Sequence, residues 1–298
     1  MRRRLLVAVT AACVALSGCG AVRVSVERAP SPTTDEGVPT PSSSPSPSSS
    51  GRVVVGAEAR RALERVVEDH PRVAIALAPV GGDGTPVTLG TDESLPAWST
   101  IKVPLALAAH RAHPKDAATR ADVEAAITAS DNEAAARLWT GLGEPAQARR
   151  AVERVLREAG DRTTRVQDRQ VVAGYSPFGQ TRWRVGDQAR FLAGAACAPD
   201  AAVVTGPMGR LVGGHLWGLA GLDGAAAKGG WGPTADGYVL RQMGLLPGAK
   251  GGRVAVAVQL RPRDHAAGTA LMDEVAAVLA EHVADLPGGR CEKASQGR

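Results

Sequence analysis

Ser99 and Lys102 form a pair whose residue types and spacing are suited to nucleophilic catalysis. They stand in the segment Ser99-Thr100-Ile101-Lys102, which opens a stretch of helical periodicity. Residues three apart on a helix share a face, so the lysine amine is expected beside the serine hydroxyl. A serine hydroxyl is a weak nucleophile until a base takes its proton, and an amine with a lowered pKa is such a base. Because a serine three residues before a lysine is common, this pair alone is a weak indication.

A second motif, Ser130-Asp131-Asn132, follows only 31 positions after Ser99. A serine hydroxyl there could pass a proton to a leaving nitrogen, and the Asn132 amide could hold a substrate carbonyl or position Lys102. Serine and aspartate are also good N-cap residues before a helix. Taken alone, the motif is more simply interpreted as a helix cap.

A third motif, Lys228-Gly229-Gly230-Trp231, precedes a loop and a predicted strand that begins at Tyr238. A lysine on an edge strand facing a cleft attracts a substrate carboxylate, and neighbouring glycines let a ligand lie along the backbone. The alternative is a plain glycine-rich turn.

The pattern of apolar residues predicts the elements that must position these motifs. Apolar runs predict strands over 73–78, 86–89, 238–246 and 254–260. Helical spacing predicts helices over 57–67, 99–113, 121–127, 132–142, 146–159, 186–196 and 265–283. This order predicts an α+β fold, with an antiparallel sheet built from both termini, flanked by helices, and an all-helical insert. The folded domain is expected over 53–290, with its sheet part at about 53–98 and 223–290 and its helical part at about 99–222.

In this order, the three motifs resemble the SxxK, SDN and KTG elements of the serine β-lactamase and penicillin-binding protein superfamily, most closely the class A β-lactamases. The most specific piece is the segment 127–135, which reads ITASDNEAA, and the resemblance covers about residues 56–285. It implies a β-lactamase-like fold, no cofactor, and an acyl-serine mechanism. Ser99 would be the acylated nucleophile, Lys102 its proton acceptor, and Ser130 the proton relay to the leaving nitrogen.

The resemblance also implies how a substrate would be held. Asn132 would bind a substrate side-chain amide, and Lys228 would hold a carboxylate while Gly230 lets the substrate lie along the strand. The backbone N–H groups of Ser99 and Trp231 would form an oxyanion hole, which stabilises the charge on the tetrahedral oxygen.

The deacylation machinery of class A enzymes is not visible in the sequence. Those enzymes carry a glutamate on an omega loop that activates the hydrolytic water. Here the corresponding segment starts near 164–169, and no Asp or Glu occurs from Arg169 through Gly186. Losing a positioned base costs about 10²–10⁴-fold in that step. We therefore expect a poor β-lactamase, unless Asp168 or Gln180 substitutes for the glutamate.

Two further departures concern the shape of the site. Gly229 stands where the family has a threonine, and the bulky Trp231 follows the glycines. The short segment between Ser99 and Ser130 predicts a site that is more open on one side. Two functions remain open: a serine hydrolase or acyltransferase acting on a β-lactam or a peptidoglycan-like amide or ester, and a non-catalytic binding protein of the cell envelope.

The N-terminal residues predict export and lipidation. Three arginines precede an apolar run from Leu5 to Leu16, and Leu16-Ser17-Gly18-Cys19 resembles a lipobox. We expect a signal peptide at 1–18, a lipid on Cys19, and a Pro/Ser/Thr-rich disordered tether at 19–52. This predicts a domain anchored at the extracytoplasmic face of the cell membrane. The alternative is an ordinary signal peptide with a chance cysteine.

The remaining cysteines, the histidines and the charge narrow the function further. Cys197 and Cys291 could form a disulfide in an oxidising compartment, or be two separate buried thiols. The sequence shows no CxxC or HExxH motif, so we predict no metal site. The formal net charge is +5, of which three charges lie in the predicted signal peptide. This small, scattered excess gives no indication of nucleic-acid binding, and the oligomeric state is left open.

Overall fold

The computed structural model describes residues 53–82 and 84–292. The predicted signal peptide, the lipid acceptor Cys19 and the tether lie outside the described residues. The strands are β1 (Val73–Pro79), β2 (Val87–Gly90), β3 (Leu95–Pro96), β4 (Arg182–Trp183), β5 (Ala226–Thr234), β6 (Gly237–Pro247) and β7 (Arg253–Leu260). The helices are α1 (Ala57–Asp69), α2 (Lys102–Ala112), α3 (Ala117–Thr128), α4 (Asn132–Gly141), α5 (Pro145–Glu158), α6 (Val185–Ala195), α7 (Ala202–Met208) and α8 (His265–Glu281).

The main sheet has five antiparallel strands in the order β2-β1-β7-β6-β5. Strand β1, from the beginning of the domain, pairs with β7, from near its end, so that Ile75 lies opposite Val258. Strands β6 and β7, which correspond to the predicted strands 238–246 and 254–260, pair as a hairpin. The structure thereby confirms the predicted α+β fold with a sheet assembled from both ends of the domain.

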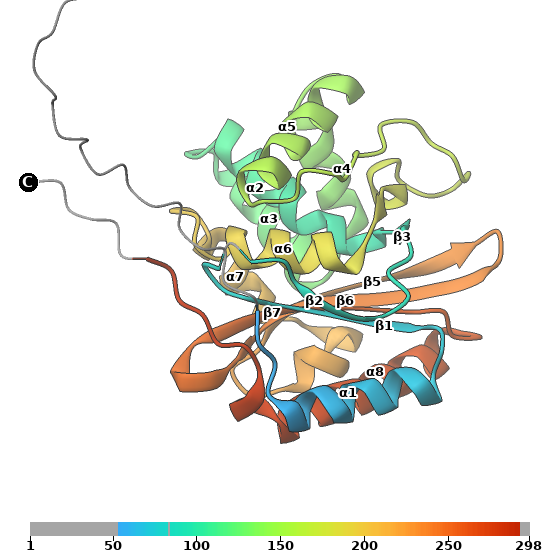
Figure 1. The fold of residues 1–298 in the computed structure, drawn as a ribbon. Helices are drawn as coiled ribbons and strands as arrows, with labels where there is room; N and C mark the ends of the chain where they lie inside the picture. The colour runs from blue at the N-terminus through green and yellow to red at the C-terminus, as the bar shows by residue number, and fades with distance from the viewer. Residues whose placement is uncertain (1–52, 83, 293–298) are drawn as a thin grey trace, which may run out of the picture. The chain divides into compact units, whose positions relative to one another are not determined.

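Helices cover both faces of the sheet (Figure 1). Helices α1 and α8 lie together on one face, and α6 with the helices α2–α5 lies on the other. Strand β1 is buried from Val73 to Ala78 because it faces a core on each side. Its larger residues Val73, Ile75 and Leu77 belong to the core beneath α1 and α8. Its alanines belong to the core shared with the helical side, where small side chains let α6 approach the sheet closely.

Strand β7 repeats this division of large and small residues. Val254, Val256 and Val258 face the α1–α8 core, whereas Ala255 and Ala257 face the helical side. Since side chains alternate between the faces of a strand, this pattern fixes which face each helix layer covers.

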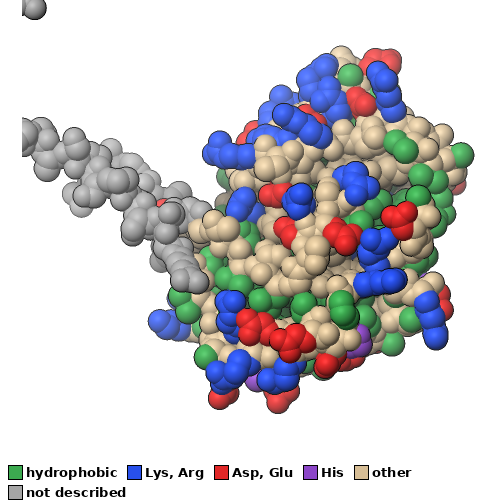
Figure 2. Space-filling model, turned by 45° about the vertical axis from the view of Figure 1, so that its right-hand side comes forward, with side chains coloured by type: hydrophobic (Ala, Val, Ile, Leu, Met, Phe, Trp, Pro, Cys, Tyr) green, Lys and Arg blue, Asp and Glu red, His purple; other side chains and the backbone are tan. Residues whose placement is uncertain are grey.

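The surface of the described domain carries charges of both signs. Figure 2 shows basic and acidic side chains over the same parts of one face. No helix within residues 53–82 and 84–292 is both long and apolar enough to cross a membrane.

Candidate active site

A cleft of about 430 Å³ brings residues of all three motifs together. Ser99 and Lys102 reach it from the start of the helical layer, Ser130 and Asn132 from the junction of α3 and α4, and Trp231 from the edge strand β5. The other residues that line it are Trp98, Gly174, Tyr175, Ser176, Phe178, Gly179, His215, Gly232, Pro233 and Tyr238. The sequence motifs, separated by up to about half the chain, therefore converge on one cavity.

Ser99 lies in a short 3-10 helix, η1 (Trp98–Ile101), that runs directly into α2. The preceding residue, Trp98, has a backbone φ of 48°. This left-handed conformation is rare and strained for a bulky residue, and such strain concentrates at functional sites. The first N–H groups of a helix have no intrahelical acceptor. The Ser99 amide therefore begins a turn whose N–H groups can serve a ligand.

Gly230 sets the distance between β5 and this turn. A Cβ atom at position 230 would lie 2.6 Å from the Ser99 amide nitrogen and 2.9 Å from the Ala97 carbonyl oxygen. Only glycine lets the two backbones approach so closely. The contact places the Ser99 amide against the segment of β5 that leads into Trp231, as the predicted oxyanion hole requires.

The Lys102 amine is held by the second motif. It donates to the Ser130 carbonyl oxygen at 2.5 Å and to the Asn132 Oδ1 at 2.8 Å, and it lies 3.3 Å from the Ser130 Oγ. Burial lowers its pKa from 10.5 to about 8, although the charge of Asp131 partly offsets this shift. Such an amine is neutral in a useful fraction of molecules near neutral pH, as a proton acceptor must be.

Lys102 does not form the expected hydrogen bond with Ser99. Within residues 53–82 and 84–292, the Ser99 hydroxyl makes no hydrogen bond, and the Lys102 amine is directed to Ser130 and Asn132 instead. Catalytic hydrogen bonds are often formed only once a substrate is bound. Asn132 here takes the positioning role that was one of its two predicted roles.

Both interpretations of the Ser130-Asp131-Asn132 motif apply, each to a different residue: Asp131 caps a helix, and Ser130 faces the site. Asp131 is the N-cap of α4, where its carboxylate accepts from the Glu133 and Ala134 amides. Ser130 makes no cap bond and has a φ of 53°, a conformation that is uncommon for serine. Its hydroxyl lies between two amines, 2.8 Å from the Lys228 Nζ and 3.3 Å from the Lys102 Nζ.

Lys228 lies on a strand and not in a glycine-rich turn. It belongs to β5, the edge of the main sheet, and its amine donates to the Ser130 Oγ and to the Gly229 carbonyl oxygen. Complete burial lowers its pKa well below 10.5, and the charge of Lys102 lowers it further. Lys228 reaches the cleft through Ser130 and does not line it directly.

Arg241, on β6, holds the segments beside the nucleophile in place. It is fully buried and donates to the Leu95, Pro96 and Trp183 carbonyl oxygens and to the Gln188 Oε1. Burial lowers its pKa to about 9. Sequence reasoning missed this residue, because an arginine inside an apolar strand gives no sign of which carbonyl groups it will meet.

Solved structures of β-lactamases have a similar arrangement of elements. The chain has the class A β-lactamase fold. The β-lactamase from Streptosporangium roseum matches with a TM-score of 0.58 at 22% identity, covering 78% of this chain and 100% of that chain. The β-lactamase from Xanthomonas campestris pv. campestris matches with a TM-score of 0.57 at 20% identity, covering 78% and 99%.

An ancestral class A β-lactamase of Gram-negative bacteria is similar to the same extent. It has a TM-score of 0.55 at 23% identity, and the match covers 75% of this chain and 99% of that chain. The sequence matches no protein-family model and no curated protein. The likeness confirms the fold that the sequence motifs imply.

The loop that faces Ser99 in this β-lactamase fold, residues 165–181, supplies no carboxylate to the cleft. Asp168 forms an ion pair with Arg149, 2.9 Å away, and is not among the cleft residues. The Gln180 side chain makes its hydrogen bonds within the loop. Its oxygen accepts from the Val171 and Val172 amides, and its nitrogen donates to the Tyr175 carbonyl oxygen. Neither residue is placed to replace a catalytic glutamate. None of the described residues that line the cleft is an aspartate or glutamate.

Aromatic residues form much of the cleft wall, and of these only Trp231 was expected from the sequence. Tyr175 packs against Trp98 with a centroid distance of 5.1 Å. The Trp231 ring centroid lies 4.8 Å from that of His265 and 5.6 Å from that of His215. Tyr175 lies in a loop, Trp98 and His215 lie in short 3-10 helices, and Trp231 lies on β5. No single periodicity in the sequence relates these positions.

Cys197 and Cys291 form a disulfide in the structure, with their Cα atoms 5.3 Å apart. The bond joins the end of the α6 region to the last described segment, which also pairs with β7 through Arg253 and Gly289. The disulfide lies outside the cleft and acts on the domain's stability.

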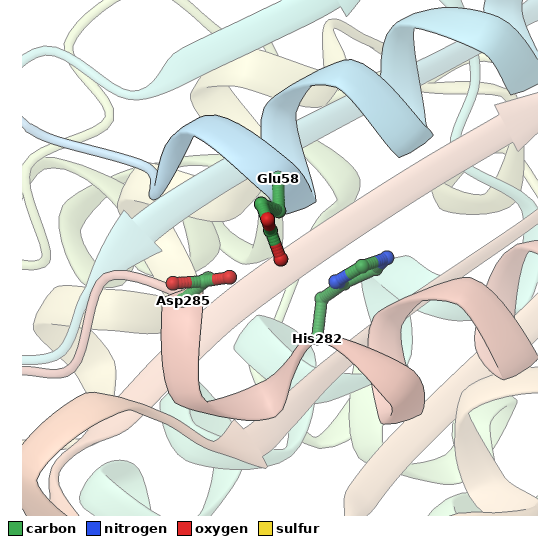
Figure 3. Close-up of side chains that lie close together, drawn as sticks. All are labelled: Glu58, His282 and Asp285. Carbon is green, nitrogen blue, oxygen red and sulfur yellow. The ribbon is translucent and has the colours of Figure 1, made fainter.

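One group of possible metal ligands lies away from this cleft. Glu58, His282 and Asp285 come from α1 and the end of the α8 region, and each places a ligand atom within 4.8 Å of the others (Figure 3). Glu58 is exposed, and the other two are half-buried. Exposed acidic groups commonly lie together without an ion, so we assign no metal to this group.

Proposed function

We propose that this protein is a serine hydrolase or acyltransferase that forms an acyl-enzyme at Ser99 with a β-lactam or a peptidoglycan-like amide or ester. The observation that carries the proposal is that Ser99, Lys102 and Ser130 line one cleft, with the Lys228 amine 2.8 Å from the Ser130 hydroxyl. These are a nucleophile, a base and a proton relay in adjoining positions.

Acylation follows from this geometry. The neutral Lys102 amine takes the proton of Ser99, and the serine oxygen attacks the acyl carbon. The Ser99 and Trp231 N–H groups stabilise the tetrahedral oxygen. The bond to the leaving group then breaks, and Ser130 passes a proton to the leaving atom from the lysine pair.

Deacylation is proposed to be slow. Hydrolysis of the acyl-enzyme needs a base that activates water, and the described residues of the cleft include no carboxylate. Ser99 is therefore expected to retain its acyl group far longer than a working β-lactamase would, or to pass it to an acceptor other than water.

A non-catalytic binding protein is the second candidate. It is favoured by the Ser99 hydroxyl, which makes no hydrogen bond to Lys102 within residues 53–82 and 84–292. In that case the buried lysines would hold an anionic ligand without any covalent step.

We further propose that the domain is anchored by a lipid on Cys19 at the extracytoplasmic face of the cell membrane. The lipobox-like Leu16-Ser17-Gly18-Cys19 and the Pro/Ser/Thr-rich segment after it support this placement. The Cys197–Cys291 disulfide is consistent with it, because disulfides persist in oxidising compartments.

A labelling experiment tests the acylation proposal. The full chain and its Ser99→Ala variant are incubated with a fluorescent penicillin, and intact mass is followed with time. A Ser99-dependent adduct that persists for many minutes is expected. Absence of an adduct with penicillin and with thioester donors would favour the binding protein, and rapid turnover of nitrocefin would contradict the slow deacylation.

A further inference from the structure

The cleft gathers an unusual share of the aromatic residues of the chain. The sequence has only five Trp, two Tyr and two Phe. Five of these nine residues line the Ser99 cleft: Trp98, Tyr175, Phe178, Trp231 and Tyr238. Aromatic side chains that enclose a cavity provide apolar contact area and flat faces for a ligand.

The rim of the cleft is apolar as well. Among the described residues, six large hydrophobic side chains are exposed. Three of them, Val171, Val172 and Tyr175, lie in the loop that contributes Gly174 to Ser176 to the cleft. Val212 and Leu216 flank His215, which lines the cleft from η3 (Gly213–His215). Exposed apolar residues scattered singly need no explanation, but five gathered on two loops beside one cleft indicate a contact surface.

Both loops are held in place by hydrogen bonds. Gln180 ties the first loop by bonds to the backbone of Val172, Tyr175 and Ser176. The second loop is fixed where the His215 Nε2 meets the Ala129 carbonyl oxygen at 3.0 Å, next to Ser130. The apolar rim is therefore formed before a ligand arrives, which lowers the entropic cost of binding.

Two buried amines lie at or just behind the floor of the same cleft. The amines of Lys102 and Lys228 are buried beside Ser130, and no described residue that lines the cleft is acidic. A buried cation is stable only when it is paired or discharged, so this site favours an anionic group on its ligand. A fitting ligand thus combines a negative charge with a large apolar part.

We propose that the acyl group transferred to Ser99 is large and apolar and lies on the aromatic walls and the rim, while the leaving side carries the anionic group that Lys228 is expected to hold. This inference rests on the proposed acylation of Ser99. The Ser99 oxygen forms a bond to the acyl carbon as the bond from that carbon to the leaving heteroatom breaks. The serine proton ends on the leaving group, so the step needs no other reactant.

Acyl thioglycolates test this proposal, since they share one carboxylate-bearing leaving group and differ only in the acyl chain. The full chain is mixed with acetyl, hexanoyl and phenylacetyl thioglycolate, and the second-order rate of Ser99 acylation is measured by intact mass and thiol release. Each buried methylene is worth about a factor of four. We therefore expect hexanoyl and phenylacetyl transfer to be at least about 30-fold faster than acetyl transfer.

Substitutions at the rim test whether these exposed side chains, and not the apolar character of the donor in general, cause the preference for a large acyl group. Leu216→Ser and Val171→Ser should each reduce the ratio of the hexanoyl rate to the acetyl rate about 3-fold. Val54→Ser is the matched control, because Val54 is the one exposed large hydrophobic among the described residues that is away from these two loops. Tyr175→Ala should reduce the phenylacetyl preference further.

The outcomes are distinguishable. Equal rates for the three donors, or a preference that the rim variants leave intact, would overturn this inference while the acylation of Ser99 stands. Failure of Ser99 to react with any donor, including penicillin, would overturn the proposed function itself. The comparison of donors on the unaltered chain does not depend on whether a variant folds.

Discussion

Two buried amines, on Lys102 and Lys228, flank the Ser130 hydroxyl, and their proximity decides which of them can carry a proton. Both have pKa values below that of an exposed lysine because burial penalises the charged form. The two charges also repel, so loss of one proton favours retention of the other. Ser99 can be activated only when the Lys102 amine is neutral and can accept the proton of the Ser99 hydroxyl.

The rate of Ser99 acylation should therefore depend on pH through Lys102. Its pKa is about 8, and the reactive form is the neutral amine, so the rate should rise about tenfold per pH unit below 8 and level off above it. Penicillin adduct formation, followed by mass from pH 5 to 9.5, measures this profile.

Lys102→Arg provides the control for that profile, because a guanidinium keeps its proton over this range. Its acylation rate should fall by about 10²–10⁴-fold. A flat profile in the unaltered chain would show that Lys102 is not the base.

Ser176 offers a position at which the absent carboxylate can be supplied. It lines the cleft from the loop opposite Lys102 and is exposed. Ser176→Glu should speed loss of the acyl group from Ser99 by about tenfold or more, because the carboxylate can activate water. The half-life of the penicillin adduct is the measurement, and Ser176→Gln, which matches glutamate in shape but not in charge, should leave it unchanged.

At the scale of elements, the contact between β5 and η1 controls the geometry of the nucleophile. The strand carries three glycines at and near this contact, and a Cβ at Gly230 would collide with the backbone of Ser99 and Ala97. Backbone atoms cannot rotate away as a side chain can, so the two elements must separate.

Gly230→Ala should therefore cost about 1–3 kcal/mol of stability and abolish the Ser99 adduct. Urea unfolding and penicillin labelling measure the two effects. Gly141→Ala is the matched control, since a Cβ at Gly141 meets nothing within 4 Å. If Gly230→Ala kept full labelling, the close approach of β5 would not be needed for acylation.

The long, periodic elements could be predicted from the sequence, whereas β5 and α7 could not. The apolar runs of β1 and β7 announce strands, and the predicted ranges for α1 and α8 match the structure within two residues. Strand β5 contains three glycines and a proline and has little intrinsic strand preference. It forms because its pairing with β6 and its contact with η1 override that local preference.

The candidate site also has a part that could be predicted from the sequence and a part that could not. The positions of Ser99, Lys102, Ser130 and Lys228 follow from motifs with fixed spacing, and the structure brings them together. Tyr175 lines the cleft from a loop and His215 from the short helix η3, and no spacing rule relates such residues to a distant nucleophile. The resting direction of the Lys102 amine, toward Ser130 and Asn132, depends on packing that sequence patterns do not encode.

At the scale of the whole molecule, the Cys197–Cys291 bond closes a loop with a sequence separation of 94 residues. Restricting the unfolded chain in this way stabilises the folded state by about 2–5 kcal/mol. The Cys197→Ser/Cys291→Ser double variant should lose this amount in urea unfolding without a change in penicillin labelling. A reducing agent should destabilise the unaltered chain equally and leave the double variant as it was.

The pairing of β1 with β7 also sets an order of events in time. Val73 pairs with Leu260, so the centre of the sheet cannot close until nearly the whole domain has left the ribosome. Until then β1 can pair only with β2, and Ile75 and Leu77, which are fully buried in the finished domain, lack the cover of α8. Synthesis therefore passes through a long interval in which an apolar strand is exposed, and a chain released before residue 260 would carry that strand unprotected into aggregation.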